Sequence, residues 1–73
     1  MREIDMVGQR CPTPIVKLNG EFRTLAPGED LLMLANDPAF EMDVQAWCRR
    51  TGNLLLGFES RDGVFRAHLR KQG

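Results

Sequence analysis

The chain has 73 residues, with ten acidic and ten basic side chains and a formal net charge of zero. Residues 1–73 are expected to form one domain whose small core leaves no room for a large enclosed substrate pocket, which favours a carrier or binding module. The balanced charge argues against a general nucleic-acid binder. No apolar run approaches the roughly 20 residues that span a bilayer, and no secretory signal is recognisable. We therefore expect a cytoplasmic protein.

The first half of the sequence predicts a strand, a helix and a second strand. Alternation of Ile4 and Met6 favours a strand at residues 3–7. Apolar residues at helical spacing predict a helix at residues 12–25 with a buried stripe formed by Ile15, Leu18, Phe22 and Leu25. Gly20 lies inside this helix, where glycine is unfavourable. Close approach of a partner to the backbone is one explanation for a glycine at this position. Residues 30–35, a continuous apolar run after Asp30, are typical of a central strand that is covered at least partly on both faces.

A second helix and a hairpin follow. Asp37 is a good N-cap and Pro38 suits the first helical position, so a helix is expected from there to Gly52. Its inner face would contain Phe40, Val44, Trp47 and Cys48. The dipeptide Asp62-Gly63 is a strong two-residue turn signal between strands at residues 54–61 and 64–71.

The hairpin register can be predicted from that turn. It would pair Arg61 with Val64 and Glu59 with Arg66, whose charges are opposite. One face would then carry Leu56, Phe58, Phe65, Ala67 and Leu69, and the other would carry Glu59, Arg66, His68 and Arg70. The order βαβαββ predicts an α/β two-layer sandwich, a four-stranded mixed sheet with two helices on one face. Either Leu32 and Leu34 or Leu31 and Met33 must face the open side, which would make it a docking surface or a dimer contact.

The residues before the first helix indicate a reactive cysteine. Pro12 and Pro14 fit the first helical turn, which places Cys11 at the N-cap, in the partial positive charge of the helix end. That position and the neighbouring Arg10 would lower the thiol pKa and give an accessible nucleophile. The alternative is a cysteine buried as a small hydrophobic residue. The backbone N–H groups of Thr13 and Ile15 could face the sulfur.

Further landmarks accompany this motif along nearly the whole chain: Asp5, Gly8, Lys17, Pro27-Gly28-Glu29, Asp37-Pro38, the segment from Trp47 to Gly52, and Asp62-Gly63. Together with Cys11-Pro12-Thr13-Pro14 they resemble the TusA-like (SirA/YedF-type) family of small sulfur-carrier proteins. Two places depart from the family. Val7 stands where an arginine is common, and Asn19-Gly20 stands where a basic pair is frequent.

The resemblance implies the same fold and a sulfur-relay function. Cys11 would accept a persulfide sulfur from a cysteine desulfurase or a rhodanese-type donor and pass it to an acceptor protein. The outlets that the family implies are tRNA thiolation, cofactor synthesis and sulfur oxidation. The supporting residues would be Arg10, Pro12, Thr13, Pro14 and Lys17. The sulfur would be held covalently on Cys11, with no cofactor, no metal and no directly bound nucleic acid. The protein would be a sulfurtransferase-type persulfide carrier and not a self-sufficient enzyme.

Two other functions fit parts of the pattern. An RNA-binding or regulatory module is compatible with the small α/β fold, although the neutral charge and few aromatic residues count against it. A thiol redox sensor would cycle Cys11 through sulfenic acid or a disulfide. Cys48 could then resolve the oxidised thiol, but its place on an apolar helical stripe favours a packing role.

Overall fold

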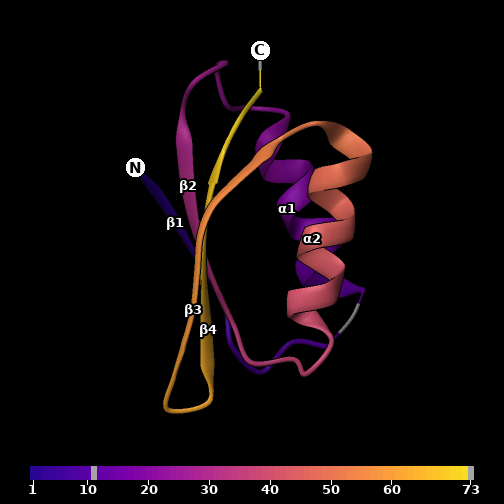
Figure 1. The fold of residues 1–73 in the computed structure, drawn as a ribbon, viewed down its shortest axis with the longest axis vertical. Coiled ribbons are helices and arrows are strands. Elements are labelled where there is room, and N and C mark those ends of the chain that lie inside the picture. Colours follow the sequence, from indigo (N-terminus) through magenta and orange to yellow (C-terminus); the bar gives the residue numbers. More distant parts are fainter. Residues whose placement is uncertain (11, 73) are drawn as a thin grey trace.

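The computed structural model describes residues 1–10 and 12–72. Its order is strand, helix, strand, helix, strand, strand, with these bounds: β1 Arg2–Met6, α1 Thr13–Phe22, β2 Asp30–Ala35, α2 Phe40–Thr51, β3 Leu54–Arg61 and β4 Val64–Arg70. Both helices cover the same face of the sheet (Figure 1). The predicted βαβαββ two-layer sandwich is therefore confirmed. Within these residues, no helix is long and apolar enough to cross a membrane.

β2 and β4 lie in the middle of the sheet, whose strand order is β1-β2-β4-β3. β1 is parallel to β2 and the other neighbouring pairs are antiparallel, so the sheet is mixed as predicted. Alternate residues of β2 are buried in the core: Leu31, Met33 and Ala35. Leu32 and Leu34 consequently face the open side of the sheet, because side chains alternate along a strand.

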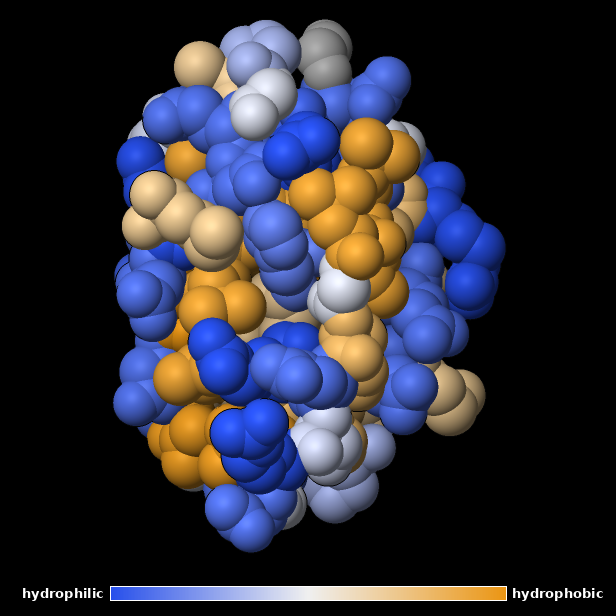
Figure 2. Space-filling view, turned by 60° about the vertical axis from the view of Figure 1, so that its left-hand side comes forward, coloured by the Kyte–Doolittle hydropathy of each residue, from blue (hydrophilic) through white to orange (hydrophobic). Residues whose placement is uncertain are grey.

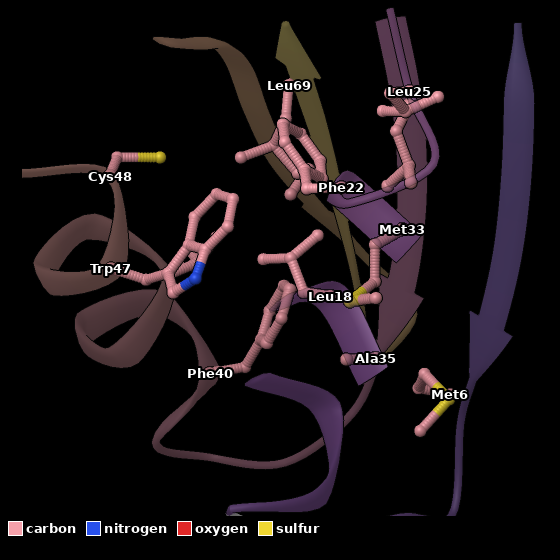
Figure 3. Packing of buried hydrophobic residues seen from close by; sticks show 13 residues of the cluster. Met6, Leu18, Phe22, Leu25, Met33, Ala35, Phe40, Trp47, Cys48 and Leu69 are labelled. Atoms are coloured by element: carbon pink, nitrogen blue, oxygen red, sulfur yellow. The ribbon is translucent and has the colours of Figure 1, made fainter. Parts of the chain in front are cut away.

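The core lies between the two helices and the covered face of the sheet (Figure 3). Trp47 on α2 is 1% exposed, and its indole packs edge-to-face against the Phe22 ring with the centroids 4.8 Å apart. Phe40 stacks on the rings of Phe58 and Phe65 from the hairpin. Side chains from both helices therefore meet those of the sheet in one cluster, and the predicted inner face of α2 is confirmed.

The helix starts differ from the prediction. α2 has Ala39 as its N-cap, two residues after the expected Asp37. The Asp37 side chain instead accepts the Ala39 N–H at 3.4 Å, and its carbonyl accepts the Phe40 N–H at 2.9 Å. Asp37 thus forms a turn that precedes the helix, a role for which aspartate competes with N-capping. At the other end Gly52, with φ of +80°, is the predicted C-cap.

The hairpin register is confirmed near the turn and wrong near its open end. Arg61 pairs with Val64, and Glu59 pairs with Arg66 through an ion pair of 3.5 Å. A bulge lies between Leu55 and Gly57, so Leu55 and not Leu56 stands opposite Leu69. The predicted core position of Leu56 is therefore wrong. One extra residue in a strand reverses the facing of every residue beyond it, and Leu56 is 43% exposed.

Replacing Gly20 with alanine is expected to raise the free energy of unfolding by about 0.5–1 kcal/mol, because glycine is a poor helix former. A Cβ atom at this position would meet no atom within 4 Å, so the added methyl group causes no clash. Urea unfolding followed by circular dichroism measures the change. Gly52→Ala is the matched control and should lower stability by about 1 kcal/mol, since its positive φ disfavours alanine. A loss of stability in Gly20→Ala would contradict the prediction.

His68 faces the open side of the sheet, as predicted, and lies next to Asp30 at the start of β2. The Arg70 Nε donates to one Asp30 oxygen at 2.7 Å, and the His68 Nε2 lies 2.8 Å from the other. The hydrogen bond from Arg70 has the largest effect on the Asp30 pKa and the contact with His68 the next largest. Together they lower this pKa to about 2. They join β2 to β4 on the surface of the sheet.

The low Asp30 pKa predicts a pH dependence of stability. Because the folded-state pKa is below the unfolded value of about 3.9, the ionised carboxylate adds stability above that value. This contribution should disappear as the pH falls through about 2. We therefore expect the stability difference between the wild type and Asp30→Asn to be largest at neutral pH and to shrink between pH 4 and pH 2. Urea titrations at these pH values measure it, and a pH-independent difference would contradict the assignment.

Candidate functional site

The loop between β1 and α1 carries the predicted nucleophile. Cys11 itself lies outside the described residues, whereas its neighbours Arg10 and Pro12 lie inside them. α1 has Pro12 as its N-cap, one residue later than the N-cap predicted at Cys11. The Val16 N–H donates to the Pro12 carbonyl at 2.9 Å, which begins the helical hydrogen bonding. The motif therefore stands at a helix start, as the sequence indicates, with its N-cap shifted by one residue.

The Thr13 N–H was predicted to be able to face the sulfur. It donates instead to the Arg10 carbonyl, with the nitrogen and oxygen 2.9 Å apart. The proline at position 12 has no N–H to donate, so Thr13 offers the next N–H to this carbonyl. Thr13 therefore shapes the loop through its backbone.

Pro14 is buried in the protein interior, whereas Pro12 and Thr13 are exposed. Pro14 therefore anchors the first turn of α1 to the protein interior. Pro12 remains on the surface next to the cysteine position. The two prolines thus act in different ways, although the sequence pattern alone treats them alike.

Asn36, directly after β2, fixes the loop that precedes Cys11. Its Oδ1 accepts the Gly8 N–H at 2.8 Å and the Arg10 Nη1–H at 3.2 Å. Gly8 needs its positive φ of +92° to present that N–H. Sequence reasoning missed Asn36. The available signal was its position after a buried strand that is parallel to β1, where polar side chains at strand ends converge.

Arg10 and Lys17 are not brought together. Arg10 donates to Asn36 and to the Gln9 carbonyl, and both of these acceptors are neutral. Among the described residues, its positive charge is therefore not paired with an acidic side chain. Lys17 instead forms an ion pair of 3.3 Å with Glu21, one turn further along α1, and this pair, followed by Arg2, lowers the Glu21 pKa. Of the two predicted supporting cations, Arg10 is the one held in the loop.

Exposed apolar side chains stand on three segments at this end of the fold. Val7 follows β1, Val16 lies in the first turns of α1, and Met42 lies in the first turn of α2. Their exposed fractions are 42%, 65% and 76%. Both helices begin at this end, where the loop from β1 also arrives (Figure 1). Large exposed apolar side chains next to a candidate reactive position are typical of a protein contact surface.

Cys48 is buried on α2 and packs in the core, as predicted. Burial raises the pKa of its thiol, which makes the thiolate scarce. Cys48 also lies in the last turns of α2, because its carbonyl accepts the Gly52 N–H of the helix end at 2.8 Å. α1 begins at the opposite end of the helical layer (Figure 1). This arrangement favours packing over a resolving role for Cys48.

Known proteins resemble this chain over nearly its whole length. The family model described as sulfurtransferase TusA matches residues 2–71. "Putative sulfur carrier protein NMA0882" of Neisseria meningitidis is 37% identical over 62 residues, which cover 85% of this chain and 84% of that protein. A "Putative sulfur carrier protein" of Aquifex aeolicus is 36% identical over 70 residues, or 96% of this chain. The present chain spans only 36% of the length of that Aquifex protein.

The fold has a counterpart among solved structures. The crystal structure of a SirA-like protein from Desulfitobacterium hafniense matches with a TM-score of 0.87 over all of both chains, at 21% sequence identity. At this identity the match concerns the fold alone. The protein family is identified by the sequence matches. On the match over residues 2–71, the chain belongs to the sulfurtransferase TusA family.

Proposed function

We propose that this protein is a cytoplasmic sulfur-relay carrier and that Cys11 holds the transferred sulfur as a persulfide. One observation supports this most directly. The Cys11-Pro12-Thr13-Pro14 motif joins β1 to the start of α1 in a chain whose family match spans residues 2–71. A relative from Neisseria meningitidis of similar length carries the name of a sulfur carrier. The donor would be a cysteine desulfurase or a rhodanese-type protein, and the outlets would be tRNA thiolation, cofactor synthesis or sulfur oxidation.

The proposed chemistry is two successive exchanges at sulfur. The Cys11 thiolate attacks the outer sulfur of the donor persulfide, a new S–S bond forms, and the donor thiolate leaves. An acceptor thiolate then attacks the outer sulfur on Cys11 and releases the Cys11 thiolate. Each exchange forms one S–S bond and breaks one, so no external oxidant or reductant is needed. No general base is required, because thiolates enter and leave.

The loop supports this chemistry in two ways. The Arg10 guanidinium, held by Asn36, and the positive end of the α1 dipole both favour a negative charge at the neighbouring position. The exposed apolar residues Val7, Val16 and Met42 would let a partner protein cover this end of the molecule. Val7 replaces a common arginine of the family, so we propose that partner contact here depends more on apolar surface than on charge.

The test is intact mass spectrometry of the wild type after incubation with a cysteine desulfurase and free cysteine. A parallel reaction uses a rhodanese and thiosulfate. We expect a gain of one sulfur atom that reductant reverses and that peptide mapping places on the peptide containing Cys11. No gain with either donor would overturn the carrier function.

Replacing Asn36 with alanine is expected to slow sulfur loading about fivefold and to lower the free energy of unfolding by about 1 kcal/mol. The substitution removes the acceptor that holds the Gly8 N–H and the Arg10 guanidinium. Loading rates by timed mass spectrometry and urea unfolding measure the two effects. Asn53→Ala is a matched control, because Asn53 also accepts a backbone N–H, that of Gln72, far from the loop. Equal loading rates in both variants would show that Asn36 does not organise the site.

A further inference from the structure

The face of the sheet opposite the helices has an ordered distribution of charge. Along this face β1 presents Glu3 and Asp5, which are exposed and acidic. β2 presents Leu32 and Leu34, and β4 presents basic side chains, among them Arg66. Figure 2 shows this side of the molecule, where apolar surface is interrupted by hydrophilic side chains around a hollow. Asp30, at the start of β2, lies in line with these leucines and is bound by Arg70 and His68 of β4. An acidic column, a column of two leucines with this paired aspartate, and a basic column thus run side by side.

The strand register aligns these columns into rows. Two rows of three residues cross the face from β1 through β2 to β4: Glu3–Leu32–His68 and Asp5–Leu34–Arg66. Each row therefore has an acid at one end, a leucine in the middle and a basic group at the other end. Paired residues on neighbouring strands point to the same side of the sheet, so each row is continuous on the open face.

This pattern is self-complementary. Consider a two-fold axis that runs parallel to the strands and lies above the open face of β2. Rotation about this axis places the β1 column of a second copy opposite the β4 column of the first. Each row of the second copy then stands opposite the same row of the first. In a second copy placed by this axis, Leu32 and Leu34 would meet the same leucines of the first copy. Asp5 would face Arg66, which also pairs with Glu59 of its own copy, and Glu3 would face His68, which also contacts Asp30. Asp30 would face the Asp30 of the second copy, with an Arg70 of each copy beside the two carboxylates. Aligned strand directions are also the usual arrangement when two sheets pack face to face, about 10 Å apart.

We propose that two copies of this chain associate through the open faces of their sheets, with the leucines of β2 at the centre and acid–base contacts on both sides. Two hollows of about 440 and 330 Å³ flank Leu32 on this face, and both are lined partly by Arg66. Gly57 leaves the first hollow open because it has no side chain. These hollows can admit side chains of the second copy. The α1 starts would remain uncovered on the two outer helical layers.

The first measurement is light scattering after size exclusion, from micromolar to millimolar protein. We expect the mass to rise with concentration from 8.3 kDa toward twice that value. Leu34→Lys places two like charges opposite each other across the axis and should weaken dimerisation at least tenfold. Val16→Lys is the matched control, because Val16 is exposed on α1 in the other layer, and it should leave the dimer intact. Circular dichroism verifies that each variant is folded.

A charge exchange tests the two-fold arrangement itself. Asp5→Lys and Arg66→Glu should each be monomeric alone, since each homodimer would contain two like-charge contacts. An equimolar mixture should form a mixed dimer, in which the introduced lysine faces the introduced glutamate and the native Asp5 faces the native Arg66. A wild type that is monomeric at millimolar concentration, a dimer insensitive to Leu34→Lys, or a mixture that stays monomeric would each overturn the proposal. The readout is mass alone, so the result is independent of the proposed sulfur chemistry.

Discussion

Replacing Cys11 with serine is expected to abolish sulfur loading, whereas Cys48→Ala should load to the same extent as the wild type. A serine hydroxyl does not form a persulfide, so the first variant lacks the attacking atom. Cys48 is 9% exposed and burial raises its thiol pKa, so a donor protein neither reaches it nor finds it ionised. Intact mass after incubation with the desulfurase or the rhodanese gives the loaded fraction of each variant.

Two controls make this comparison decisive. Circular dichroism should show that both variants are folded, with Cys48→Ala less stable by about 1 kcal/mol because it loses a buried sulfur from the core. Alkylation of the native wild type by iodoacetamide should modify one thiol quickly and the second only after unfolding. Residual sulfur on Cys11→Ser that maps to Cys48 would contradict the assignment, and it would revive a role for the pair in thiol oxidation.

Trp47→Ala is expected to have the largest effect on stability, a loss of about 3–5 kcal/mol. The indole is 1% exposed and contacts the Phe22 ring between the two helices. Small domains have a total stability of about 5–15 kcal/mol, so this loss removes a large share of it. Urea unfolding followed by circular dichroism at 222 nm is the suitable measurement, since the substitution also removes the only tryptophan fluorophore.

A graded series separates packing from hydrogen bonding at this position. Trp47→Phe keeps an aromatic ring near Phe22 but loses the 3.4 Å hydrogen bond from the indole Nε1–H to Asn19 Oδ1. Its free energy of unfolding should lie between that of the wild type and that of Trp47→Ala. Met42→Ala is the control on the same helix and should change stability by less than about 0.5 kcal/mol, because Met42 is 76% exposed. Equal effects at Trp47 and Met42 would contradict the packing described above.

The fold could be predicted from the sequence wherever local signals agreed with one another. Asp62-Gly63 fixed the turn, and both residues have the positive φ that a tight hairpin turn uses, +53° and +78°. The helical spacing of Leu18 and Phe22 identified the buried face of α1. The bulge beside Gly57 could not be predicted, because it depends on which leucine of β3 packs best against the core. That competition between Leu55 and Leu56 is decided by tertiary contacts.

The site was predictable only in part. The Cys11-Pro12-Thr13-Pro14 motif indicated a helix start, and α1 begins there. Asn36 was invisible to reasoning along the chain, because it reaches Gly8 and Arg10 only through the parallel pairing of β1 with β2. The N-cap at Pro12 was also missed, since a turn closed by the Arg10 carbonyl competes with capping by the preceding residue. Contacts between distant segments therefore account for what the sequence motifs left out.

The bulge in β3 has a consequence for how the protein behaves in a crowded solution. β3 is an edge strand, and Leu54 and Leu56 expose apolar surface along it, with exposed fractions of 42% and 43%. A regular edge strand of this kind offers a continuous row of N–H and C=O groups on which a foreign strand can grow. The register shift between Leu55 and Gly57 breaks that row in the apolar half of the strand. The irregularity thus protects the edge against strand addition and fibril growth.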